Sequence, residues 1–118
     1  MPSVYVTGSN GYLIEAAMRD CQDIGYTAKG ALVGTSDAKS AMDSVFEADV
    51  VLVLLSSVLD QESFVVMGLA LAYGRTIYLV DHVGSDCAFC QLTPQDGLRT
   101  FGTTLEAMQA LEEDLNVE

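Results

Sequence analysis

Residues 49–55 read Asp49-Val50-Val51-Leu52-Val53-Leu54-Leu55, and this stretch decides the fold. Six apolar residues follow one another without a polar residue between them, so a strand formed here has no face suited to solvent. Strands covered on both faces are typical of the centre of a parallel sheet that has helices on either side. We therefore predict an α/β fold built around a buried strand at residues 50–55.

Helical and β-rich patterns alternate on both sides of this strand. Apolar residues at helical spacing predict helices over 13–24, from Ser36 to 46, over about 62–73, and over 105–115 after a Thr103/Glu106 capping box. Gly25 and Gly74 are typical helix stops. The remaining strands are predicted at 3–7, 27–34, 76–80 and 98–101.

This order of elements predicts the topology of the sheet. Parallel strands joined through helices make right-handed crossovers, which build a doubly wound sheet. We expect a flavodoxin-like α/β fold with five parallel strands in the order 2-1-3-4-5, and one domain over residues 1–118. Residues 50–55 and 76–80 should be parallel neighbours. The third helix is apolar nearly all round, which favours a homodimer over burial within one domain.

Composition excludes several classes of function. The net charge of −12 would repel a polyphosphate backbone, so nucleic-acid binding is not expected. No apolar stretch reaches the roughly 18 residues of a membrane span, and no signal peptide is visible at Met1-Pro2-Ser3. Three cysteines, an odd number, suit a reducing compartment. We expect a cytoplasmic protein without a membrane partner.

Doubly wound sheets bind ligands beyond the carboxyl ends of strands 1 and 3, where the strand order reverses. The first strand ends in Gly8-Ser9-Asn10-Gly11, which lets a ligand approach the backbone and the N–H groups of the next helix. The same residues also suit an ordinary strand-to-helix turn. Gly8, Ser9 and Asn10 are therefore candidate ligand-binding residues.

The third strand is followed by Ser56, Ser57, Asp60, Gln61 and Glu62. Two carboxylates at the start of a helix are suited to acid–base or nucleophilic chemistry. The alternative is structural, with Asp60 capping the third helix and Glu62 favouring its dipole. Asp60 and Glu62 are the candidate catalytic residues, and Ser56 is a candidate ligand contact.

The fourth strand is followed by Asp81 and His82, and then by residues 83–97 with little regular pattern. A long loop in so small a domain is usually functional. It contains Cys87 and Cys90, which together with His82 make three zinc-type ligands. A structural zinc site needs a fourth, and Cys21 is expected in a helix, so we predict no metal and no cofactor. His82 remains a candidate ligand contact.

Several stretches resemble the nucleoside 2-deoxyribosyltransferases and the deoxynucleoside 5′-monophosphate N-glycosidases, with the end of the chain similar to short phage-type members. They are Val4-Tyr5-Val6-Thr7-Gly8-Ser9, residues 48–55, Asp60, residues 68–75, and residues 83–107 through Phe89, Leu92 and Phe101. The resemblance implies that Tyr5 lines the base or sugar pocket. It also implies that Gly8, Ser9 and Asn10 border the pocket or hold a 5′-phosphate, and that Asp60 contacts the base or assists its departure.

The sequence departs from this family at the nucleophile. The family's nucleophilic Glu stands two residues before the helix glycine, and here that position is Val66. Glu62 lies one helical turn earlier, about 5.4 Å away, which is too far for the same substrate position. The departure weakens the implied chemistry more than the implied fold.

Three hypotheses follow. The first is a protein that binds a nucleoside or nucleotide, with weak or absent N-glycosidase activity. The second is an active N-glycosidase or deoxyribosyltransferase that uses Glu62 and Asp60. The third is a protein-interaction module that keeps the fold but not the pocket. The resemblance also implies a homodimer and, for a viral member, the host cytoplasm.

Overall fold

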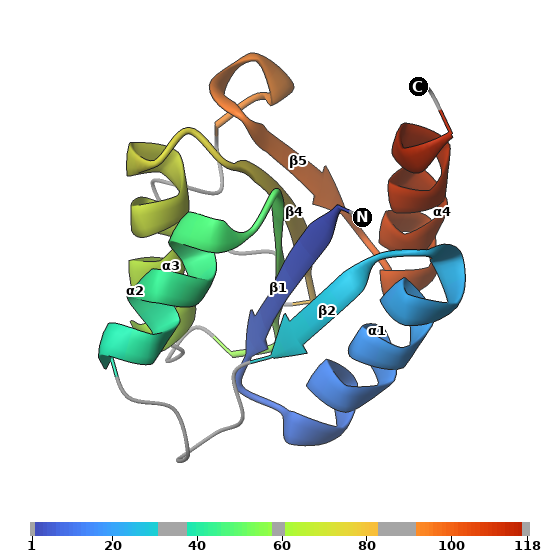
Figure 1. Cartoon of the computed structure of the whole chain (residues 1–118), viewed down its shortest axis with the longest axis horizontal. Helices are drawn as coiled ribbons and strands as arrows, with labels where there is room; N and C mark the ends of the chain where they lie inside the picture. Colours follow the sequence, from blue (N-terminus) through green and yellow to red (C-terminus); the bar gives the residue numbers. More distant parts are fainter. Residues whose placement is uncertain (1, 31–37, 58–60, 83–91, 117–118) are drawn as a thin grey trace.

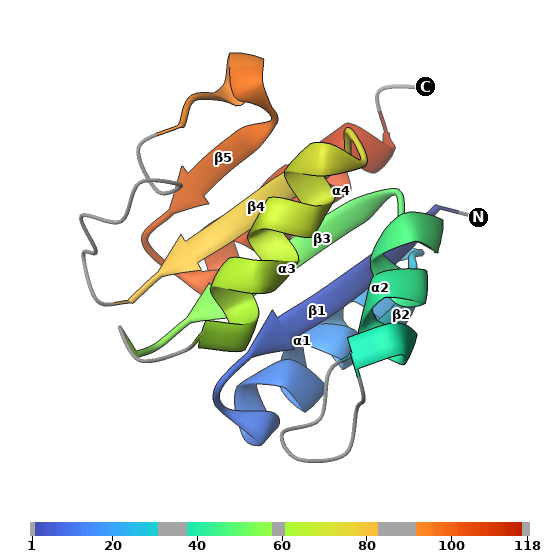
Figure 2. The same cartoon turned by 90° about the vertical axis from the view of Figure 1, so that its left-hand side faces the viewer.

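The protein is an α/β sandwich of three layers (Figures 1 and 2). The computed structural model describes residues 2–30, 38–57, 61–82 and 92–116. Its elements are β1 (Ser3–Gly8), α1 (Gly11–Ile24), β2 (Thr27–Gly30), α2 (Ala38–Glu47), β3 (Val50–Leu55), α3 (Gln61–Ala72), β4 (Thr76–Asp81), the short 3₁₀ turn η2 (Pro94–Asp96), β5 (Leu98–Phe101) and α4 (Thr104–Leu115).

The five strands form one sheet in the order β2-β1-β3-β4-β5, and every neighbouring pair is parallel. Between β3 and β4 the register runs from Val50 opposite Thr76 to Leu55 opposite Asp81. The predicted fold class, strand order and pairing of residues 50–55 with 76–80 are confirmed. The carboxyl ends of all five strands consequently lie at one edge of the sheet.

Each face of the sheet carries two helices, with α1 and α4 on one side and α2 and α3 on the other (Figure 2). The apolar run explains this arrangement, because β3 contributes to both cores. Leu52 and Leu54 pack toward α1 and α4, whereas Val51, Val53 and Leu55 pack toward α2 and α3. Fully burying one such aliphatic side chain stabilises the fold by about 1.5–3 kcal/mol.

The helix ends follow the local sequence. The Asn10 side chain caps α1, because its Oδ1 accepts hydrogen bonds from the backbone N–H groups of Tyr12 (3.0 Å) and Leu13 (3.3 Å). Gly25 and Gly74 end α1 and α3 with φ values of 125° and 71°, which glycine adopts readily. At the start of α4 the Thr103 hydroxyl accepts from the Glu106 N–H, as the capping pattern predicts.

Two segments differ in extent from the prediction. β2 covers residues 27–30, and residues 31–37, including the predicted cap Ser36, lie outside the described part of the chain. In the stretch 83–97, predicted to have little regular pattern, residues 83–91 lie outside the described part, and η2 forms at Pro94–Asp96. There the Asp96 carboxylate accepts from the Thr93 N–H and hydroxyl, both at 3.0 Å, and these bonds lower the pKa of Asp96.

Cys21 is buried in the core between α1 and α4, with its Sγ 3.9 Å from the Met108 sulfur. Burial, with a smaller contribution from the nearby Asp20 charge, raises the pKa of this thiol to about 12. A thiol in this state behaves as a small apolar side chain. No helix among the described residues is long and apolar enough to cross a membrane.

Candidate functional site

The carboxyl ends of β1 and β3 meet as the predicted switch point requires. Ser9 follows β1 and Ser56 follows β3, and their hydroxyl oxygens lie 2.8 Å apart. Both residues are accessible to solvent, so the hydroxyl pair is available to a ligand at this edge. Two hydroxyls provide both donors and acceptors, which suits sugar hydroxyls or a phosphate.

Gly8 is the last residue of β1 and is buried opposite Leu54 of β3. A Cβ on Gly8 would lie 2.7 Å from the Leu54 carbonyl oxygen. The glycine therefore serves the close approach of two strands, which is a structural reason independent of any ligand.

Asn10 has a structural task as well, because its Oδ1 already serves the Tyr12 and Leu13 N–H groups. The first turn of α1 consequently has fewer unpaired N–H groups for an anion than the sequence indicates. Tyr12 was not among the predicted site residues. Its side chain is 87% exposed, immediately after the candidate loop. In the sequence, Tyr12 is recognisable as an aromatic residue that lies outside the apolar stripe of α1.

Tyr5 lies in the middle of β1, and its ring is buried toward α2 and α3 with 3% exposure. Burial raises the pKa of its hydroxyl, and the negative charge of Glu62 raises it further. Tyr5 therefore remains a neutral donor at physiological pH. Glu62 itself is exposed in the first turn of α3, so the fold brings this carboxylate within electrostatic reach of the Tyr5 hydroxyl.

Val66 occupies the position where the resemblance places the nucleophilic carboxylate. Its side chain is only 5% exposed and belongs to the apolar core beneath α3, together with Met67 and Ala70. A carboxylate buried among apolar groups would lose hydration without a compensating partner.

His82 directly follows β4 and is exposed, and its backbone N–H donates to the Leu55 carbonyl at 3.0 Å. Asp60, Cys87 and Cys90 lie outside the described residues. Within the described ranges, no three His, Cys, Asp or Glu side chains lie together as a metal site.

Solved structures of other proteins share this fold. The 2-deoxyribosyltransferase of Bacillus psychrosaccharolyticus superposes with a TM-score of 0.67 at 13% identity, over 92% of this chain and 96% of its own. The fold is that of the deoxyribosyltransferase-like proteins. The CMP N-glycosidase of Clostridium botulinum has the same fold, with a TM-score of 0.67 and 15% identity over 92% of this chain and 98% of its own.

A pilus assembly-related protein of Burkholderia pseudomallei also superposes on this chain, with a TM-score of 0.61 and 15% identity over 96% of this chain and 90% of its own. No model of a known protein family matches this sequence, and no curated protein does. Because one fold hosts different functions, activity has to be argued from the site residues.

Proposed function

We propose that this protein binds a nucleoside or nucleotide at the carboxyl edge of its sheet and cleaves the N-glycosidic bond slowly or not at all. The observation that carries the proposal is the buried Val66, where the resemblance places the nucleophile. A valine has neither charge nor lone pair, so no covalent glycosyl intermediate forms there. The nucleoside class is supported by the fold and by the hydroxyl groups at the strand ends.

The proposed ligand contacts come from three strands and the loops that follow them. The Ser9 and Ser56 hydroxyls would hydrogen-bond the sugar or a 5′-phosphate, and the protonated Tyr5 hydroxyl would donate from the floor of the site. Gly8 and Asn10 would border the ligand, while His82 would approach it from the end of β4. The protein would act in the cytoplasm, as its composition suggests.

A second candidate function is N-glycosidase or deoxyribosyltransferase activity through Glu62. The effect of the Glu62 charge on the pKa of the Tyr5 hydroxyl favours it, because this carboxylate lies within electrostatic reach of the candidate site. Asp60 would then protonate the departing base. In this reading the substrate would have to lie about one helical turn nearer the start of α3 than in the family.

Ligand binding can be tested by thermal unfolding with nucleosides and nucleotides. At a ligand concentration of a hundred times Kd the stabilisation is about 2.7 kcal/mol, which raises the Tm of a domain of this size by roughly 10 °C. We expect Ser56→Ala to reduce this rise. Thr100→Ala, which removes an exposed hydroxyl on β5, should leave it unchanged. If no nucleoside or nucleotide raises the Tm, the protein is better explained as an interaction module.

We also propose that the protein is a homodimer through an apolar surface on α2 and α3, formed by Met42, Phe46 and Val65. These are three of the five large apolar side chains that are exposed among the described residues. The Phe46 ring packs edge-on against the Tyr73 ring at a centroid distance of 5.4 Å, and Arg75 donates to the Phe46 carbonyl oxygen at 2.6 Å. Exposed patches of this kind favour association.

Val65→Glu should convert the dimer to a monomer at micromolar concentration, because it places a carboxylate inside the apolar contact. Val65 is 62% exposed, so the substitution should leave the fold intact. Leu105→Glu is the matched control, since Leu105 is 68% exposed on α4, on the other side of the sheet. Light scattering after size exclusion reports the mass. A wild-type monomer at this concentration, or dissociation by Leu105→Glu alone, would contradict the proposed interface.

A further inference from the structure

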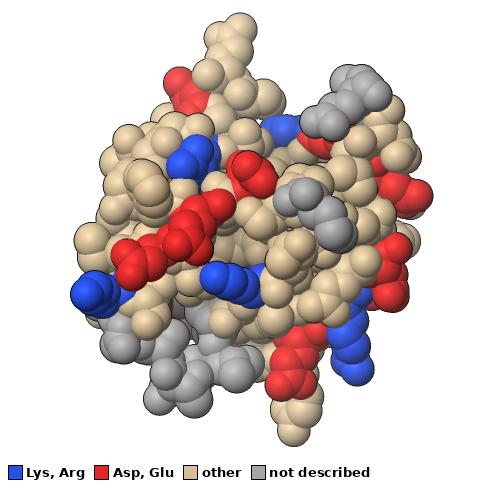
Figure 3. All heavy atoms as spheres, viewed as in Figure 1, with Lys and Arg blue, Asp and Glu red and all other residues tan. Residues whose placement is uncertain are grey.

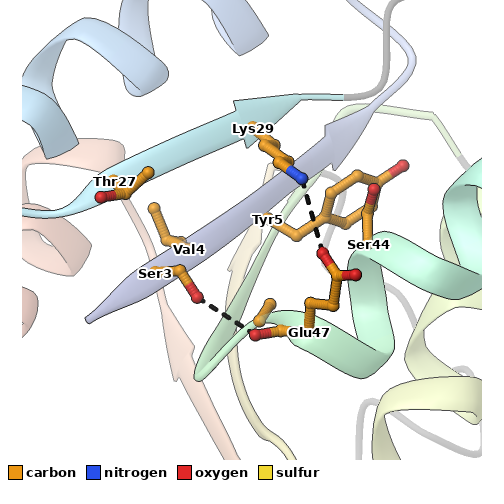
Figure 4. A pocket seen from close by; sticks show the side chains of 8 residues that line it. Ser3, Val4, Tyr5, Thr27, Lys29, Ser44 and Glu47 are labelled. Atoms are coloured by element: carbon orange, nitrogen blue, oxygen red, sulfur yellow. Dashed lines mark hydrogen bonds and ion pairs between the residues drawn. The ribbon is translucent and has the colours of Figure 1, made fainter. Parts of the chain in front are cut away.

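A recess lies between the β2 edge of the sheet and α2. We call it the α2–β2 recess. It consists of a cavity of about 140 Å³ toward the amino ends of the strands and a neighbouring cavity of about 330 Å³ toward their carboxyl ends. Tyr5, Lys29 and Ser44 line both cavities, so the two are parts of one feature. Figure 4 shows Lys29 reaching from β2 to Glu47 of α2, with Tyr5 and Ser44 next to this bridge.

The shared lining is rich in hydrogen-bond donors. Tyr5 and Ser44 each contribute a hydroxyl group to this lining. Lys29 adds an ammonium group. Met18, Ala28 and Ala41 add apolar groups to the lining of the larger cavity. A donor-rich lining with one cation favours a ligand with several acceptor oxygens and a negative charge.

The Lys29 ammonium can be released to such a ligand. Its nearest Glu47 oxygen lies at 3.6 Å, beyond a good charge-assisted hydrogen bond, and both side chains are about two-thirds exposed. Exposed ion pairs of this kind contribute little stability. On the face drawn in Figure 3, the basic side chains of the described residues stand apart among acidic ones, which suits one small anion rather than a polyanion.

We propose that the α2–β2 recess is a second binding site, for a small oxyanion such as a phosphate monoester or a carboxylate, held by Lys29, Ser44 and Tyr5. Among the described residues it shares only Tyr5 with the proposed nucleoside site. The ion pair sets its affinity: Glu47 competes with the ligand for the Lys29 ammonium. The two members of the pair therefore act in opposite directions on ligand binding.

The site can be tested by titrating the protein with inorganic phosphate and with acetate at constant ionic strength, with sodium chloride as the control. Backbone amide NMR shifts report binding. At least one of them should give saturable shifts at Lys29, Ser44 and Glu47, and the tighter one identifies the oxyanion class. Lys29→Gln should weaken this binding about tenfold, whereas Glu47→Gln should strengthen it severalfold. Shifts that stay linear, or that sodium chloride reproduces, would overturn the proposal.

Arg19→Gln is the matched control, because it removes one positive charge from α1 outside the recess. It should bind the anion as the wild type does, and equal weakening in Lys29→Gln and Arg19→Gln would show that only net charge matters and would overturn the site. Ser56→Ala should leave the phosphate or acetate affinity unchanged. Failure of the nucleoside site would appear as no nucleoside-induced rise in Tm, with the recess titration unaffected.

Discussion

Deoxynucleoside 5′-monophosphates incubated with this protein should release free base many orders of magnitude more slowly than ordinary enzymes turn over, which is on the order of 1–10³ per second. The reason is the buried Val66, which leaves the family's nucleophile position without a carboxylate. Losing a nucleophile removes the covalent route altogether rather than slowing it a fewfold. Free base separated by liquid chromatography after long incubation is the measurement.

Any residual release of base should depend on Glu62, since the charge of this carboxylate raises the pKa of the Tyr5 hydroxyl. Glu62→Gln should abolish it. Glu106→Gln is the matched control, because Glu106 is also an exposed glutamate in the first turn of a helix, on the opposite face of the sheet. Release at ordinary rates that Glu62→Gln does not change would contradict this view of the site, and would direct attention to residues 82–97.

Position 66 can also be tested directly. Val66→Glu should release base faster than Val66→Gln, which matches its size and polarity but has no nucleophilic oxygen. Both should be less stable than the wild type, because a polar group is placed in the apolar core beneath α3. Since burial raises the pKa of a carboxyl group, the rate of Val66→Glu should increase with pH over the range in which that group ionises.

The sequence predicts the sheet well because its central information is local. The uninterrupted apolar run of β3 is compatible only with cover on both faces, and the glycines at 25 and 74 end their helices for backbone reasons that a sequence shows directly. β2 is harder to predict because it is a short edge strand in which Thr27 and Lys29 are exposed. Its sequence lacks the alternation of apolar and polar residues that is typical of a strand.

The candidate site is only partly visible in the sequence. Because Ser9 and Ser56 follow the carboxyl ends of parallel strands, the sequence predicts that they lie at the same edge of the sheet. Their 2.8 Å contact, however, depends on the exact register of β1 and β3. The coupling of Glu62 to Tyr5 depends on how α3 lies over the sheet. The α2–β2 recess arises from the spacing between a helix and an edge strand, and no local pattern encodes that spacing.

Gly8→Ala should lower the free energy of unfolding by about 1–3 kcal/mol, the usual cost of overpacking a close contact. Its new methyl group would lie 2.7 Å from the Leu54 carbonyl oxygen and 3.2 Å from the Leu54 Cβ. The carbonyl belongs to the backbone of the central strand, so it cannot rotate away as a flexible side chain would. Chemical denaturation of the ligand-free protein, with the slope compared between variants, gives the change.

Gly11→Ala supplies the comparison, because Gly11 borders the same candidate site at the start of α1, and a Cβ there meets no described atom within 4 Å beyond its chain neighbours and its own helix backbone. Alanine is the better helix former by up to about 1 kcal/mol, so this variant should be as stable as the wild type or slightly more stable. The pair separates two reasons for the glycines of the first loop. If Gly8 served only the approach of a ligand, Gly8→Ala would leave the ligand-free protein as stable as Gly11→Ala does, and the role assigned to the β1–β3 contact would be wrong.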